Sequence, residues 1–162
     1  MSFYLKIDGI DGNVSSQGHT GWIGVNSLQH GVKRNLNVTP GKVADREGTT
    51  PQISELILTK KVDKASPRLF AASCSGGSQG TILIHACHTG SQLETFLQYT
   101  LSDGVISNYE VIGMSDEHSQ ELQEKLHINF TKMEMKFTPR DASNRAGHPI
   151  VSSYDLKTAK TG

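Results

Sequence analysis

The chain has 162 residues, and its 16 lysines and arginines are balanced by 16 aspartates and glutamates. This length suits one domain with a sizeable core. The balanced charge argues against the basic face by which proteins bind nucleic acid, and it favours association mildly. Apolar runs such as TILIHAC are too short to cross a bilayer. The start, MSFYLKIDGIDG, does not have the pattern of a secretory signal, so we expect cytosolic synthesis and export only by a route without an N-terminal address.

The N-terminal segment predicts a strand with one buried face, because Phe3, Leu5 and Ile7 alternate with polar residues. The segment 33–52, KRNLNVTPGKVADREGTTPQ, has little periodicity, and its prolines and glycines interrupt any regular element. A loop of this length is uncommon in a compact domain and is usually functional or disordered. Two interpretations therefore stay open, a passive insertion and a segment that contacts other subunits.

The second interpretation is chemically reasonable, because arginine offers planar, paired donors to a partner's carboxylates or carbonyls. The prolines also stiffen the segment and lower the entropy that it loses on docking. The candidate contact residues of this loop are Arg34, Asn37, Val38, Lys42, Val43, Arg46 and Glu47.

The next element is a short helix. Ser66 followed by Pro67 predicts its start, and Gly76 predicts its left-handed end. We expect Leu69 and Phe70 to be buried, and Cys74 to share their face and point into the core.

Cys74 also raises the alternative of a Cys–His hydrolase, because it stands between two serines just before a glycine pair. A nucleophilic thiolate is favoured at a helix N-terminus, whereas Cys74 lies at the C-terminal end. We therefore interpret Cys74 as a packing residue and predict no catalytic residues.

The following strand carries His85 and Cys87 on one face, where they could supply two metal ligands. Zinc takes three or four ligands, and the other histidines are scattered along the sequence, so we expect no metal and no cofactor. Cytosolic synthesis favours free thiols at Cys74 and Cys87, although a bridge between them stays open.

The second half of the chain continues with a period of two. Ile82, Ile84 and Ala86 form one alternating set, and Leu93, Leu97, Tyr99 and Leu101 form another. The turn signal at 102–104 leads to a strand over 105–111. In 122–139 the apolar parity changes after Phe130, which predicts a bulge or a bend at which the strand changes its buried face. The predicted fold is mainly β: a single domain over 1–162, a compact antiparallel barrel of about eight strands with one short α-helix and a long extended loop.

Several segments, taken in order, resemble the Hcp family, the haemolysin co-regulated proteins of type VI secretion. They are YLKIDGIDG at 4–12, SELILTKKVDKASPRLFAASCSGG at 54–77 with its D-x-x-S-P-x-L core, FLQYTLSDGVISNYEV at 96–111, EKLHINFTKMEMKFTP at 124–139 and YDLKTAKTG at 154–162. Many members carry a glycine-rich tract in the long loop. This chain has NVTPGKVADREGTTPQ there, and resembles the branch with an arginine-rich, proline-containing loop.

The resemblance implies a structural protein rather than an enzyme. It implies hexameric rings that stack into the inner tube of a contractile injector, export without a signal peptide, and effector proteins carried in the lumen. Type VI spike, sheath and baseplate proteins would be its further partners. Two alternatives remain from other classes, the Cys–His hydrolase and a monomeric β-barrel binding module.

Overall fold

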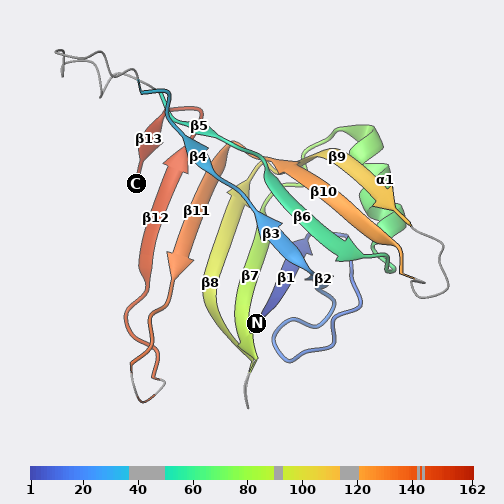
Figure 1. Cartoon of the computed structure of the whole chain (residues 1–162), viewed down its shortest axis with the longest axis horizontal. Coiled ribbons are helices and arrows are strands. Elements are labelled where there is room, and N and C mark those ends of the chain that lie inside the picture. The colour runs from blue at the N-terminus through green and yellow to red at the C-terminus, as the bar shows by residue number, and fades with distance from the viewer. Residues whose placement is uncertain (37–49, 90–92, 114–120, 142, 144) are drawn as a thin grey trace.

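The computed structural model describes residues 1–36, 50–89, 93–113, 121–141, 143 and 145–162. These residues form two larger antiparallel sheets that face one another, with one helix beside them (Figure 1). Sheet A contains, in spatial order, β13 (Lys160–Thr161), β12 (Ile150–Asp155), β11 (Lys132–Phe137), β8 (Leu93–Ser102), β7 (Ile82–Thr89), β1 (Ser2–Ile7) and β2 (Ile23–Val25). Sheet B contains β3 (Ser27–Gln29), β6 (Leu56–Lys61), β10 (Gln123–Asn129) and β9 (Val105–Ile112).

The mainly β, antiparallel fold predicted from the sequence is confirmed. The described residues contain thirteen strands, of which five have two or three residues and eight have six or more. The eight longer strands correspond to the predicted number, because a period of two is visible only over several residues. The described strand pairings form two larger sheets, A and B, which pack face to face.

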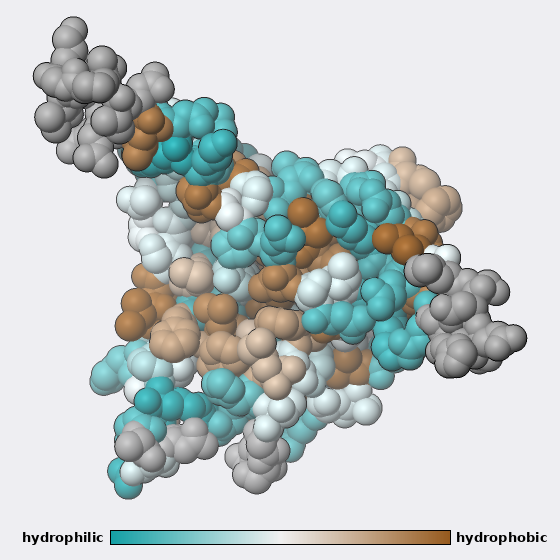
Figure 2. All heavy atoms as spheres, viewed as in Figure 1, coloured by the Kyte–Doolittle hydropathy of each residue, from teal (hydrophilic) through white to brown (hydrophobic). Residues whose placement is uncertain are grey.

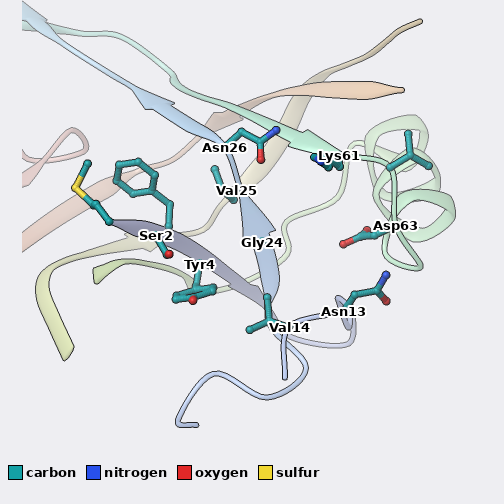
Figure 3. Close-up of a pocket in the computed structure, with 12 residues that line it drawn as sticks. Ser2, Tyr4, Asn13, Val14, Gly24, Val25, Asn26, Lys61 and Asp63 are labelled. Atoms are coloured by element: carbon teal, nitrogen blue, oxygen red, sulfur yellow. The ribbon is translucent and has the colours of Figure 1, made fainter. Parts of the chain in front are cut away.

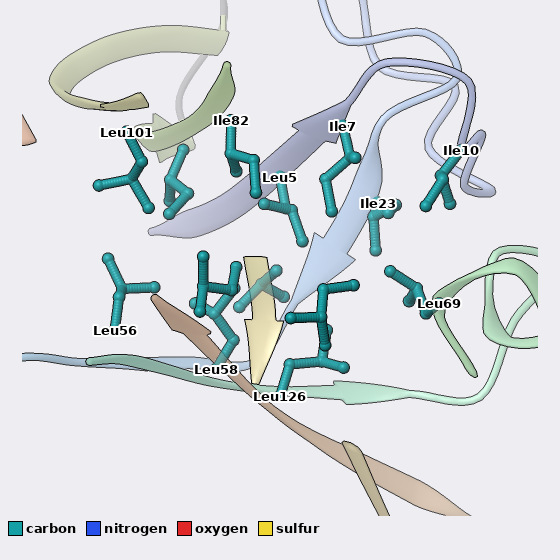
Figure 4. Close-up of a cluster of buried hydrophobic side chains, with 14 of the residues drawn as sticks. Leu5, Ile7, Ile10, Ile23, Leu56, Leu58, Leu69, Ile82, Leu101 and Leu126 are labelled. Atoms are coloured by element: carbon teal, nitrogen blue, oxygen red, sulfur yellow. The ribbon is translucent and has the colours of Figure 1, made fainter. Parts of the chain in front are cut away.

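The core lies between the two sheets and consists mainly of branched aliphatic side chains (Figure 4). Sheet A contributes Leu5, Ile82 and Leu101, and sheet B contributes Leu58 and Leu126, all with 0% exposure. Such complete burial contributes roughly 1.5–3 kcal/mol for each side chain. The alternation seen in the sequence therefore identifies the inner face of β1, β7 and β10 correctly.

The change of parity in 122–139 marks a crossing between the sheets. β10 belongs to sheet B and β11 to sheet A, and Phe130 and Thr131 lie between them. Leu126 and Met133 thus reach one core from opposite sides. The predicted change of buried face is confirmed, but the segment forms two strands rather than one bent strand.

A register shift between Ala86 and Cys87 corrects one predicted face. Ala86 pairs with Leu97 but Cys87 pairs with Thr95, so Phe96 has no direct partner on β7. The bulge turns the first residues of β8, including Leu93, away from the face of Leu97. The predicted common face of Leu93, Leu97, Tyr99 and Leu101 is therefore wrong at Leu93 alone.

Helix α1 (Ser66–Ser75) ends as the sequence predicted, since Gly76 has a φ of 65° and donates its N–H to the carbonyl of Ala72. Its start differs. Ala65 is the N-cap residue and makes no side-chain cap, while Ser66 is already helical. The amide of Asp63 donates to Oγ of Ser66, and Oδ1 of Asp63 accepts from the amide of Ala65. This reciprocal pair satisfies backbone groups at the helix start in the manner of a capping box.

The long loop is closed at its base by a third, two-stranded sheet, formed by β4 (Val32–Lys33) and β5 (Gln52–Ile53). The hydroxyl of Ser54 reinforces this base, because it accepts from the amide of Gly31 and donates to the carbonyl of the same residue. Figure 1 shows β4 and β5 leaving the body together at one corner. Lys33 and Gln52, predicted as loop ends, are therefore strand residues.

Candidate assembly surfaces

Lys60 lies at the centre of a buried polar network beneath α1. Its Nζ donates to Oε2 of Glu124 at 2.6 Å, to Oδ1 of Asp63 at 2.8 Å and to a backbone carbonyl at 2.7 Å. Oγ of Ser66 lies 3.5 Å away, and the side chains of Lys60 and Glu124 have 0% exposure. Tyr109 donates its hydroxyl to Oε1 of Glu124. Burial, followed by this bond and the charge of Glu124, raises the pKa of Tyr109 to about 12.

The network explains the residues of the D-x-x-S-P-x-L segment. Asp63 and Ser66 organise the helix start and also surround the Lys60 ammonium. Leu69, the last residue of the segment, has 0% exposure and joins the core. The segment therefore ties α1 to β6 and β10, and its role is structural.

Sheet A extends beyond sheet B and leaves part of its inner face uncovered. In the register of β8, β11 and β12, Leu97 pairs with Phe137, and Phe137 pairs with Ile150. Met135 and Phe137 are each 42% exposed, and Ile150 is 64% exposed. We call Met135, Phe137 and Ile150 the overhang. Figure 2 shows apolar side chains gathered over β11 and β12, beside sheet B.

A second apolar surface lies at the other side of the molecule, where α1 meets the end of sheet B. It consists of Val62, Phe70, Val111 and Leu122, which are 43–56% exposed. The amide of Val62 donates to the carbonyl of Leu122, and the ring of Phe70 lies 5.8 Å from that of Tyr109, two residues before Val111 on β9. We call this set the helix-end patch. Figure 1 places α1 and the end of β9 on the opposite side from β11 and β12.

Phe70 and Cys74 do share one face of α1, but it is the exposed face. Phe70 is 56% exposed and Cys74 is an exposed free thiol, whereas Ser66, Leu69 and Ala72 are the buried residues of the helix. The predictions that Phe70 and Cys74 are buried are therefore wrong. A ten-residue helix can bury only one stripe, and that stripe follows the three-residue spacing of Ser66, Leu69 and Ala72.

Cys87 is the cysteine that approaches histidine. Its Sγ lies 3.9 Å from Nε2 of His19 and 3.3 Å from Oγ1 of Thr95, and Nε2 of His19 lies 2.9 Å from Nδ1 of His85. Cys87 has 0% exposure, and burial raises the pKa of its thiol despite the bond to Thr95. Both features disfavour a nucleophilic thiolate. Within the described residues, no group of three or more His, Cys, Asp or Glu is placed to hold a metal ion.

An open groove lies between the β1–β2 end of sheet A and the end of β6 (Figure 3). Tyr4, Gly24 and Val25 line one side, and Lys61 and Asp63 line the other. Both charged groups already have partners, since Lys61 pairs with Glu121 and Asp63 pairs with Lys60. The groove therefore presents little unpaired charge with which to hold a small ligand.

Arg34 is the only residue of the predicted loop site that lies in the described part of the chain, and it is exposed just after β4. The other candidate contact residues, Asn37, Val38, Lys42, Val43, Arg46 and Glu47, lie outside the described residues. Their role therefore stays a prediction.

Comparison with known proteins identifies the family of the chain. Residues 4–137 match the family described as type VI secretion system effector, Hcp. The chain belongs to the Hcp family. Protein hcp1 of Pseudomonas aeruginosa is 27% identical over 109 residues, which is 65% of each chain.

Two solved structures have the same fold. The structure of a type six secretion system protein superimposes with a TM-score of 0.92 at 24% identity, covering 99% of both chains. Hcp1 from Salmonella typhimurium gives a TM-score of 0.76 at 23% identity, covering 99% of this chain and 98% of that one. At such identities the likeness establishes the fold.

The Hcp resemblance read from the sequence is thus confirmed, and with it a place in type VI secretion. No helix in the described part of this Hcp protein is long and apolar enough to span a bilayer.

The sequence analysis did not predict the overhang or the contact of His19 with His85 and Cys87. His19 and His85 are 66 positions apart, and only the folded arrangement of the 11–22 segment over β7 joins them.

The buried network generates a stability prediction. Lys60→Met should lower the free energy of unfolding by about 3–5 kcal/mol, because it leaves the buried carboxylate of Glu124 without its cation. Lys61→Met is the matched control: it removes the neighbouring lysine from an ion pair whose side chains are both 58% exposed, and should cost less than about 1 kcal/mol. Urea unfolding measures the free energy of unfolding of both variants. Equal decreases in the two variants would refute the prediction that the Lys60 network stabilises the fold more than an exposed ion pair does.

The two cysteines should differ in the same measurement. Cys74→Ala should change the free energy of unfolding by less than about 0.5 kcal/mol, as an exposed substitution does. Cys87→Ala should cost about 1 kcal/mol or more, because it truncates a fully buried side chain. Loss of a measurable hydrolytic activity in Cys74→Ala would contradict the prediction that Cys74 is not catalytic and support the Cys–His hydrolase instead.

Proposed function

We propose that this Hcp protein is a structural tube subunit of type VI secretion. Copies join head to tail into hexameric rings, and the rings stack into an inner tube that is exported with effectors in its lumen. Family membership supports this assignment. The observation that carries it is the pair of unlike apolar surfaces, the overhang and the helix-end patch, on opposite sides of the chain.

The overhang is costly to leave in water. Fully burying a Met, Phe or Ile side chain contributes roughly 1.5–3 kcal/mol. Met135 and Phe137 keep 42% of their surface exposed and Ile150 keeps 64%, so covering the three contributes a few kcal/mol in total, roughly half of the full value for each. A contiguous apolar face on a sheet is typical of an interface rather than of a free surface. A second copy of the chain supplies a matching cover.

The two surfaces favour a head-to-tail contact over a symmetric pair. They come from different elements, β11 and β12 on one side and α1, β9 and the ends of β6 and β10 on the other. A two-fold pair would bury one kind of surface and leave the other exposed on both copies. A contact that joins unlike surfaces repeats until it closes, and a closing rotation produces a ring.

We also propose that the assembled tube interacts with other proteins of the type VI apparatus. Spike, sheath and baseplate proteins of the type VI apparatus would contact the assembled tube, and effector proteins would travel in its lumen. Family membership supports these partners and export without a signal peptide.

Surface substitution tests the ring directly. Met135→Lys blocks the overhang and Phe70→Lys blocks the helix-end patch, and each variant should be monomeric at micromolar concentrations where the wild type forms rings, because a buried lysine without a partner is costly. Each variant keeps the other surface, so an equimolar mixture should form dimers but no rings. Native mass spectrometry distinguishes these species.

Ile112→Lys is the matched control, since Ile112 is 55% exposed but lies on the opposite face of β9 from Val111. It should still form rings. A monomeric wild type would refute ring formation itself. Rings in both Met135→Lys and Phe70→Lys would instead show that other surfaces make the contact.

The long loop should serve assembly rather than folding. Replacing residues 37–49 with a short Gly-Ser turn should leave the thermal unfolding transition nearly unchanged, because the β4–β5 ladder closes the loop base independently. Rings or stacked tubes should be lost, because the arginine-containing segment beyond Arg34 would no longer be present to reach a neighbouring subunit. Circular dichroism and negative-stain imaging measure the two effects. Normal tubes in the shortened variant would make the loop a passive insertion, and an unfolded variant would place it in the core.

A further inference from the structure

His19 and His85 form a histidine pair that the tube function does not use. Nε2 of His19 and Nδ1 of His85 lie 2.9 Å apart, so one ring donates and the other accepts. The pair keeps this bond with one added proton, but a second proton leaves two N–H groups facing each other. Such an arrangement has no acceptor and places two like charges in contact.

The surroundings of the pair are aromatic and largely dry. His19 is 6% exposed, stacks on Tyr4 at 4.7 Å between ring centres, and meets the edge of Trp22 at 4.7 Å. Trp22 also lies 4.6 Å from the ring of His85. In the part of the chain that the structure describes, Nδ1 of His19 and Nε2 of His85 are buried without a hydrogen-bond partner.

The titratable groups around the pair cannot compensate an added positive charge. Tyr4 faces it from β1 and Cys87 from β7, while Lys136 of β11 adds a further positive charge that acts on His85. Gln98 of β8 and the backbone of Gln17 are neutral hydrogen-bonding groups that raise the pKa values of His85 and His19, but burial outweighs both contributions. Among the described residues, no carboxylate contributes to the charge environment of either ring.

The pair also holds one segment against sheet A. The segment 11–22 is bonded to itself, since the amide of Gly12 donates to the carbonyl of Gly21 and the amide of Val14 donates to the carbonyl of Trp22. It therefore behaves as one unit. Among the described residues, its polar side-chain contacts with the sheet are the His19–His85 bond, the contact of His19 with Cys87 and a long contact of 3.4 Å between Ser16 and Tyr4.

We propose that the His19–His85 pair is an acid-operated latch, which holds segment 11–22 against sheet A while it shares a hydrogen bond and releases the segment when both rings are protonated. The release uncovers the aromatic surface of Tyr4 and Trp22. This inference goes beyond tube assembly and does not depend on it.

The charge environment sets the direction of the pH dependence. Burial lowers the pKa of His19, and burial together with the charges of His19 and Lys136 lowers the pKa of His85 to about 4. Both values lie below the ordinary 6.5, so the latch is fully closed above pH 6.5. Its contribution to stability is lost as the pH falls from 6.5 toward about 4.

Trp22 is the only tryptophan in the sequence, so its fluorescence reports on the latch alone. Between pH 7 and pH 4 the emission of the wild type should shift to the red, and amide hydrogen exchange in 11–22 should accelerate several-fold while far-UV circular dichroism stays constant. His85→Asn places a neutral amide at the position of Nδ1, and His19→Gln places one at the position of Nε2. Both variants should abolish the pH-dependent change.

His30→Gln is the control, because burial also lowers the pKa of His30 but its Nε2 bonds to Tyr99 instead. It should behave as the wild type does. If segment 11–22 is already released at pH 7 in either His85→Asn or His19→Gln, that result would also support the histidine pair as the contact that holds the segment. Wild-type exchange and emission that stay constant down to acid unfolding, or a normal transition in His85→Asn, would overturn the latch.

Discussion

The central constraint on this molecule is that a seven-stranded sheet packs against a four-stranded one. Most strands of sheet A have apolar residues on their inner face to remove from water, but sheet B is wide enough to cover only the middle and the β1–β2 side. Leu5, Ile84 and Leu101 are consequently fully buried, whereas Phe137 and Ile150 on the overhanging strands are not. The overhang thus follows from the unequal widths of the two sheets. As a result, a single chain leaves a contiguous apolar surface exposed to water.

Helix α1 covers one end of sheet B, and this contact differs from the apolar packing between the two sheets. Instead of apolar packing alone, the contact includes the buried ammonium of Lys60 with the carboxylates of Asp63 and Glu124. A buried ion pair contributes little net stability compared with apolar packing, but a misplaced partner is strongly penalised. We infer that the network selects one position of α1 on the sheets. That position presents Phe70 outward, and so the network determines where the helix-end patch lies.

Local patterns were sufficient wherever a feature depends on neighbours in the sequence. The alternation of Leu5 with Lys6 identified a strand and its inner face, and Gly76 identified the end of the helix. The ordered segments also identified the family, because they combine turns, capping residues and strand patterns that occur together. The change of parity after Phe130 located a crossing between sheets, although it did not reveal that the crossing separates two strands.

Features that depend on the relative position of distant segments were decided only by the tertiary structure. The exposed side of α1 is one example: Leu69 and Phe70 are adjacent and equally apolar, and only the position of sheet B determines that Leu69 is buried and Phe70 is not. The meeting of His19 with His85 is another, because it requires segment 11–22 to lie across β7. The sequence by itself determined most element types, the inner faces of strands such as β1, β7 and β10, and the family, since these arise from local patterns. The tertiary structure decided the overhang, the helix-end patch and the histidine pair, since these arise from which surfaces the packed sheets leave uncovered.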